Sequence, residues 1–129
     1  MKDIRYEKLA NNLLTYSVNI QKGETILIEV LGEEALPLAK EIMKIAEELG
    51  AKPYFNILNY ELLRIFLQNA DEEQIKMYAK HDEIRMKDMD AYIGIRAPSN
   101  TAELNGISRE VMELYNKYSA INASWQKAF

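Results

Sequence analysis

Residues 18–58 read as one strand–helix–strand unit, and this unit constrains the fold more than any other part of the chain. The run TILIEVL at residues 25–31 is short, rich in β-branched side chains and almost wholly apolar. Such a run is typical of a strand buried on both faces of a parallel sheet. Glu29 is its one charged residue, and we expect it to lie toward a strand end or against a partner.

A helix is predicted between the two strands of this unit. Apolar side chains recur at helical spacing over residues 35–49, and the helix is expected to start at residues 34–36. Pro37 is tolerated only in a first turn, and Gly50 is a typical helix stop. The second strand is predicted at residues 54–58, after Pro53, which fits only the first position of a strand. Two parallel strands joined by a helix form a right-handed crossover.

The remaining elements extend this unit into a single domain, residues 1–129. The alternation of helices and strands predicts a three-layer α/β fold, a small parallel sheet flanked by helices in a Rossmann or flavodoxin-like layout. The expected strand order is 2-1-3, which opens a crevice at the carboxyl ends of strands one and three, near residues 32–34 and 96–100. The further elements are helices at 3–18, 60–69, 71–86 and 108–127, and a third strand at 90–95.

Composition and local pattern disfavour several function classes. The net charge of −4 gives no basic surface for nucleic acid. The turn after the first strand holds Gly32 followed by Glu33 and Glu34, which would repel a phosphate, so nucleotide binding is not expected. No apolar run is long enough to span a membrane, and the amino terminus lacks an apolar signal core. The chain has no cysteine, which suits a reducing cytoplasm.

No catalytic or metal-binding residue is predicted within the chain. His81 is the single histidine, and a metal needs several convergent ligands, so we interpret His81 as part of a solvated helix surface. The acidic pair at residues 33–34 complements a helix dipole, and the pair at 47–48 lies on a solvated helix face. No G-x-S-x-G sequence for a serine nucleophile is present.

Short motifs in order along nearly the whole chain resemble the N-terminal domain of the aminopeptidase T (thermophilic leucyl aminopeptidase) family of metallopeptidases. Each motif is weak alone, and their order and spacing carry the resemblance. The matching stretches are LTYS at 14–17, QKGE at 21–24, LPL at 36–38, ELGA at 48–51 and DMDAYIGIRAPSN at 88–100.

The resemblance implies a cytoplasmic, homodimeric exopeptidase that removes N-terminal residues from peptides with a pair of divalent metals, zinc, cobalt or manganese. In that family the metal ligands belong to a later, C-terminal catalytic domain, so none is transferred to a position here. The expectation is therefore an N-terminal domain that shapes the cleft or the oligomer and is inactive by itself.

The loop at residues 96–100 is the one candidate contact with substrate or with the missing catalytic domain. Arg96 and Asn100 are polar groups expected at the carboxyl end of a strand, where binding residues gather. The simpler interpretation is a loop whose Asn100 side chain bonds its own backbone. The alternative function is a standalone, non-enzymatic α/β interaction or binding domain. A third, a flavodoxin-like cofactor binder, is disfavoured by Glu33 and Glu34.

Overall fold

The chain folds around a sheet of three parallel strands. The computed structural model describes residues 4–97 and 107–121, with side chains up to residue 115. Strands β1 (Thr25–Leu31), β2 (Lys52–Leu58) and β3 (Ala91–Arg96) pair in the order β2-β1-β3. The predicted 2-1-3 order is confirmed, and β1 is the central strand, parallel to both neighbours.

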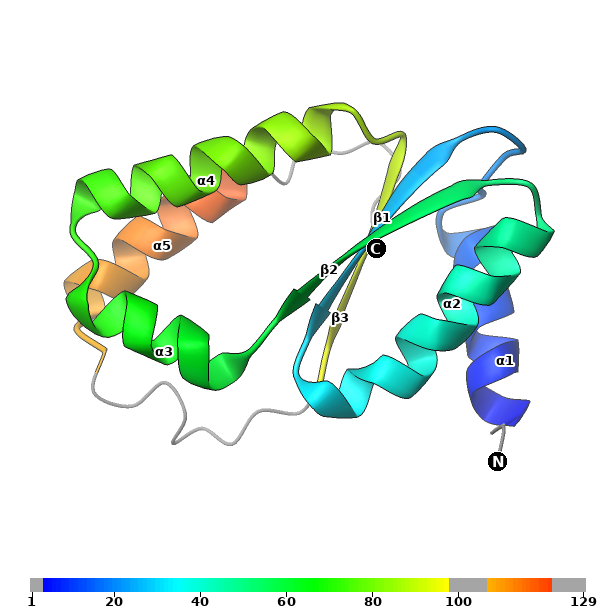
Figure 1. Cartoon of the computed structure of the whole chain (residues 1–129), viewed down its shortest axis with the longest axis horizontal. Helices are drawn as coiled ribbons and strands as arrows, with labels where there is room; N and C mark the ends of the chain where they lie inside the picture. Colours follow the sequence, from blue (N-terminus) through cyan, green and yellow to red (C-terminus); the bar gives the residue numbers. More distant parts are fainter. Residues whose placement is uncertain (1–3, 98–106, 122–129) are drawn as a thin grey trace.

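Helices cover both faces of this sheet, which confirms the three-layer α/β class. Figure 1 shows α1 and α2 on one side of the strands, and α3, α4 and α5 on the other. None of the helices within the described ranges is long and apolar enough to cross a membrane. The bounds are α1 (Ile4–Asn12), α2 (Leu36–Glu48), α3 (Tyr60–Asn69), α4 (Glu72–Lys87) and α5 (Arg109–Ile121).

The main hydrophobic core lies between the sheet and the α1–α2 layer. Alternate residues of β1 point into it, because successive strand side chains face opposite sides of a sheet. This alternation leaves Leu27, Glu29 and Leu31 on the opposite face, which α3, α4 and α5 cover. Fully buried members of the core include Leu14, Ile26, Ile28, Ile42 and Ile93.

Local side-chain and backbone features mark the helix ends, among them the predicted stop at Gly50. Gly50 follows α2 with φ of 85°, a conformation that glycine adopts without steric penalty. Asp71 accepts from the Gln74 backbone N–H at 2.8 Å, and the Gln74 side chain accepts from the Asp71 N–H at 3.2 Å, so a capping box opens α4. The Ser108 hydroxyl accepts from the N–H of Val111 at 3.2 Å and caps α5.

The N-terminal helix differs from the single helix predicted over residues 3–18. The α-helix ends at Asn12, and a wider π-helical turn, Leu13–Ser17, follows it. In this turn the Val18 N–H donates to the carbonyl of Leu13, five residues back, at 3.0 Å. Both Leu13 and Leu14 are buried in this turn.

Strand β2 begins two residues earlier than predicted, and the placement of Pro53 at its first position was wrong. The Lys52 N–H donates to the carbonyl of Glu24 at 2.8 Å, so the ladder starts before the proline. Hydrogen bonding to β1 alternates along β2, which turns the Pro53 nitrogen to the outer edge. Proline therefore removes no ladder bond, as is usual for edge strands.

Candidate polar site on the sheet

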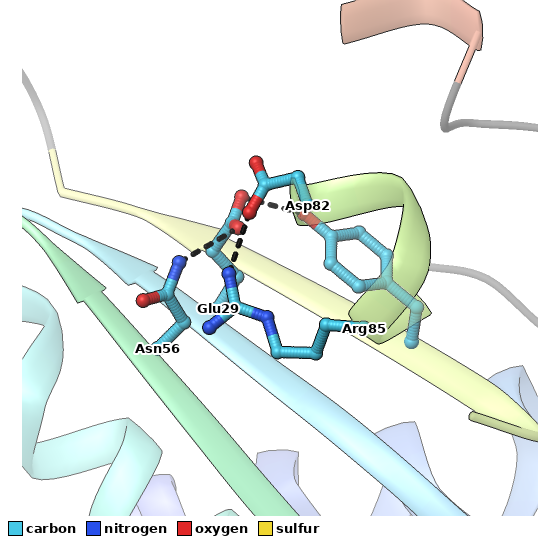
Figure 2. Close-up of polar contacts among 5 residues, drawn as sticks. Glu29, Asn56, Asp82 and Arg85 are labelled. Carbon is cyan, nitrogen blue, oxygen red and sulfur yellow. Dashed lines mark hydrogen bonds and ion pairs between the residues drawn. The ribbon is translucent and has the colours of Figure 1, made fainter. Parts of the chain in front are cut away.

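A group of polar side chains occupies the sheet face beneath α4. We call it the polar cluster: Glu29, Asn56, Tyr92, Asp82 and Arg85. Glu29 stands in the middle of β1, in register with Asn56 on β2. The Asn56 amide donates to Glu29 Oε2 at 3.2 Å, and the Tyr92 hydroxyl donates to Glu29 Oε1 at 3.0 Å. The Glu29 carboxylate is thus held by both neighbouring strands (Figure 2).

Gly94 makes the Tyr92 contact possible. Tyr92 and Gly94 lie on the same face of β3, and Gly94 is in register with Glu29. A Cβ atom at Gly94 would lie 2.8 Å from the Tyr92 hydroxyl and 3.2 Å from Cε1 of its ring. Because Gly94 has no side chain, space is left through which the Tyr92 phenol reaches Glu29.

Helix α4 closes the cluster from above. Its Arg85 guanidinium donates to Asp82 Oδ1 at 2.5 Å. Figure 2 shows that the Asp82 carboxylate and the Arg85 guanidinium both extend toward Glu29. Arg85 Nε is buried and has no hydrogen-bond partner among the described residues. Because its charge lies beside the Asp82 carboxylate, Arg85 offsets part of the negative charge of the cluster.

The surroundings keep two tyrosines protonated. Burial raises the pKa of Tyr92, and the negative charge of Glu29 and the hydrogen bond to it raise it further. Burial also raises the pKa of Tyr78, on α4, to about 12, with the charge of Asp82 as the next cause. At neutral pH the Tyr92 hydroxyl is therefore a hydrogen-bond donor to a carboxylate.

The sequence interpretation placed Glu29 only in part. It was expected toward a strand end or against a partner, and the second alternative is found, because Glu29 lies at the centre of β1 and accepts hydrogen bonds from Asn56 and Tyr92. Its partners come from β2 and β3 of the same chain.

Asp82 was missed, although a signal was present. It lies seven residues after the buried Ile75 and four before the buried Met86, a spacing that predicts an apolar residue.

The polar cluster does not fit a pair of divalent metals. Within residues 4–97 and 107–121, no group of three or more histidine, cysteine, aspartate or glutamate side chains converges. The two carboxylates of the cluster already accept hydrogen bonds from Asn56, Tyr92 and Arg85. The positive charge of the Arg85 guanidinium, which pairs with Asp82, opposes binding of a metal cation. His81 is exposed on α4, as its interpretation as a solvated helix residue predicted.

The crevice predicted between the carboxyl ends of β1 and β3 is filled where the structure describes it. The Tyr60 hydroxyl donates to the carbonyl of Ala97 at 2.9 Å. Gly32, with φ of 96°, packs so closely that a Cβ atom there would lie 2.7 Å from Ala97 Cβ and 3.1 Å from the Tyr60 ring. Tyr60 therefore joins the ends of the two strands. Residues 98–100, which form the other part of the expected crevice, lie outside the described residues, so the crevice stays a prediction.

The two predicted contact residues have different outcomes. Arg96 is exposed at the end of β3, in register with Leu31 of β1. It shares the sheet face of Tyr92, and its positive charge acts to lower the pKa of that phenol. Asn100 lies outside the described residues. The structure thus places Arg96 at the rim of the face that carries the polar cluster.

Comparisons with known proteins identify relatives of this chain. The model of a family described as thermophilic metalloprotease (M29) matches residues 2–127. Among solved structures, wild-type AmpT from Thermus thermophilus matches with a TM-score of 0.64 and 22% sequence identity. The match covers 92% of this chain and 31% of that one, so the chain spans about a third of the AmpT length. No match is found among the curated proteins.

Proposed function

Because the chain belongs to the thermophilic metalloprotease family, we propose that it is the N-terminal, non-catalytic domain of a longer metal-dependent aminopeptidase. The observation that carries the proposal is the family match over residues 2–127, which includes every helix and strand of the described structure. The match to 31% of AmpT supports a domain-sized part of a longer enzyme. The proposed reaction is removal of N-terminal residues from peptides.

The catalytic metals are proposed to bind outside this chain. Zinc, cobalt or manganese are the candidate ions, and a pair of them needs several histidine or carboxylate ligands. The chain offers one histidine and no cysteine, and Glu29 and Asp82 are engaged by neutral and cationic donors. The role proposed for this domain is to shape the substrate cleft or the oligomer interface of a cytoplasmic homodimer, with leucyl peptides among the substrates.

An aminopeptidase assay tests the proposal. The purified 129-residue chain is incubated with a leucyl amide and zinc, cobalt or manganese, beside a longer protein that adds the sequence encoded after Phe129. We expect metal-dependent turnover from the longer protein and none from the chain alone. Turnover by the chain alone would contradict the non-catalytic role. A stop codon directly after Phe129 would favour the standalone binding domain instead.

Arg96 and Asn100 are proposed to contact the substrate or the catalytic domain. Arg96 supports this because it is exposed at a strand end and its guanidinium pairs well with carboxylates. In the longer enzyme, Arg96→Ala and Asn100→Ala are expected to raise KM for a substrate contact, or to lower kcat and stability together for an interdomain contact. Arg109→Ala is the matched control, because that exposed arginine pairs only with its helix neighbour Glu113 in the described structure. Unchanged KM and kcat in both variants would refute the role.

A further inference from the structure

Helices α3 and α4 cross the sheet over its central strand. They leave the carboxyl end of β2 and lead back to the amino end of β3. Because β2 and β3 lie on opposite sides of β1, the two helices have to pass over β1 and its Glu29 (Figure 1). Helix α5 packs on both of them. We call residues 60–87, which comprise α3 and α4, the strap.

The strap packs separately from the main hydrophobic core. That core joins the sheet to α1, the π-helical turn and α2, and none of residues 60–87, all of which the structure describes, belongs to it. The buried residues of the two strap helices are Leu63 and Leu67 on α3, and Ile75 and Met86 on α4. Ile75 and Met86 lie near opposite ends of α4, so the middle of this helix has no buried apolar side chain.

The middle of α4 instead presents a polar stripe to the sheet. Tyr78, Asp82 and Arg85 are spaced by four and three residues, which places them on one face of the helix. Figure 2 shows that Asp82 and Arg85 extend toward Glu29 on the central strand. The strap thus meets β1 through polar side chains, whereas a helix is ordinarily held on a sheet by apolar ones.

The polar groups on each side of this contact are bonded within their own layer. Glu29 accepts hydrogen bonds from Asn56 and Tyr92, and all three residues belong to the sheet. Asp82 pairs with Arg85, and both belong to α4. Separation of the two layers breaks none of these bonds, and water can solvate the polar atoms that separation exposes. Exposure of polar surface costs less free energy than exposure of the same area of apolar surface.

The strap is fixed to the sheet at its two ends. The Tyr60 hydroxyl donates to the carbonyl of Ala97 at 2.9 Å, where the strap begins. Shortly after it ends, the Thr25 N–H donates to Asp90 Oδ2 at 2.9 Å, and the Asp90 N–H donates to the carbonyl of Thr25 at 3.0 Å. These contacts fix where the strap leaves and rejoins the sheet, so separation is easiest between them.

We propose that the strap opens from the sheet as a unit, together with α5, while the main hydrophobic core stays folded. Partial opening of this kind takes place below the free energy of global unfolding in parts of a protein that bury little apolar surface. The closed strap covers Glu29, Asn56 and Tyr92, and the open strap presents them to solvent. The fold thus contains a cover over the polar face of its sheet. This inference does not depend on the aminopeptidase proposal.

Thiol labelling measures the opening. The chain has no cysteine, so each variant carries one reactive thiol. Ile75→Cys places the thiol in the strap, and Ile42→Cys, the matched control, places it in the main hydrophobic core; the parent side chains are 2% and 0% exposed. For Ile75→Cys we expect an opening free energy below the one from its own urea unfolding curve, and a weaker dependence on urea. For Ile42→Cys the two free energies should agree. Agreement in both variants would overturn the proposal.

A second substitution distinguishes opening of the strap from global unfolding. Ile26 lies in the main hydrophobic core, which stays packed when the strap opens. Addition of Ile26→Val is therefore expected to speed labelling of Ile42→Cys by about two- to tenfold and to leave labelling of Ile75→Cys unchanged. Equal acceleration at both positions would show that the strap is exposed only by global unfolding, which would refute the opening.

Hydrogen exchange of the unaltered chain tests whether the strap opens as a unit. We expect the slowest amides of α3 and α4 to converge on one common opening free energy as urea is added, below that of the central strand β1. Separate values that never converge would mean independent local fluctuations of the two helices, and would contradict a single opening unit.

Discussion

The Tyr92 hydroxyl donates a hydrogen bond of 3.0 Å to Oε1 of Glu29, across the space left by the missing side chain of Gly94. The bond joins the central strand to β3 through residues 63 positions apart in sequence. It satisfies a carboxylate that stands in the middle of an otherwise apolar strand. The three residues therefore act as one unit, and altering any of them affects the other two.

Gly94→Ala is expected to destabilise the fold by displacing the Tyr92 hydroxyl. Overpacking and a lost hydrogen bond to a charged group each have magnitudes of about 1–3 kcal/mol. Tyr92→Phe removes the hydroxyl alone, and the double variant closes a thermodynamic cycle in urea unfolding. We expect the two effects to be clearly non-additive, because the added Cβ acts mainly on the hydroxyl. Additive effects would show that the Cβ disturbs something else.

Stability is expected to fall at alkaline pH through Tyr78 and Tyr92. The pKa of both is raised above the ordinary value of 10.0, to about 12 for Tyr78. Above pH 10 the unfolded chain releases these protons while the folded chain retains them, so the unfolded state binds fewer protons and folding becomes less favourable. The free energy of unfolding should be insensitive to these groups below pH 10 and decline from there toward pH 12.

The control for the alkaline effect is an exposed tyrosine. Tyr78→Phe and Tyr92→Phe should each flatten the decline in urea midpoints above pH 10. Tyr16→Phe should leave the profile unchanged, because Tyr16 is 83% exposed. An equal effect of all three substitutions would mean that the loss of stability above pH 10 comes from the net charge of the chain and not from the burial of Tyr78 and Tyr92.

Gly32→Ala is expected to be more damaging than Gly23→Ala. Both glycines have positive φ, of 96° and 86°, so both substitutions strain the backbone, and Gly32, with ψ of 140°, lies outside the left-handed helical region. A Cβ at Gly23 meets no atom within 4 Å, whereas at Gly32 it meets Ala97 Cβ at 2.7 Å. Thermal unfolding of the two variants measures the combined effect of the clash and of the backbone strain at Gly32. Equal loss would show that the strand ends relax freely around Ala97.

The capping box of α4 is expected to contribute more than its surface ion pairs. Asp71→Ala removes the cap and should lower the free energy of unfolding by about 1 kcal/mol. Lys76→Ala removes an exposed pair with Glu72 of 3.8 Å and should change it by less than about 0.5 kcal/mol. Urea unfolding of both variants measures the two changes in the free energy of unfolding. A larger loss for Lys76→Ala than for Asp71→Ala would contradict the greater contribution of the capping box.

The sequence predicts the frame of the fold because its signals are local. The apolar run of β1, the period of α2, the stop at Gly50 and the cap at Asp71 each act within a few residues, and the crossover rule adds the right-handed connection from β1 through α2 to β2. Pro53 shows the limit of such rules. Proline has no backbone N–H, so it cannot donate a hydrogen bond to a neighbouring strand. Only the position of β2 at the edge of the sheet shows that the Pro53 nitrogen faces outward, where no such bond is needed.

The polar cluster could not be assembled from sequence because its contacts are distant. Glu29 and Asp82 each stand out as a charge in an apolar pattern, but nothing local relates one to the other. Tyr92 reaches Glu29 only through the register of β3. The Tyr60 contact with Ala97 spans 37 residues and likewise depends on where two strands end. Arg96 was predicted from its place at the end of β3, and its role stays a prediction.

Glu29 also disfavours a shifted pairing register of the central strand β1. Strand side chains alternate between faces, so a slip of one residue in β1 would carry the carboxylate from its partners into the α1–α2 core. An ion left there without partners would lose several kcal/mol of solvation. A wholly apolar β1 would lack this penalty and could pair in either alignment. The single charge in the run TILIEVL thus determines which alignment the folding chain retains.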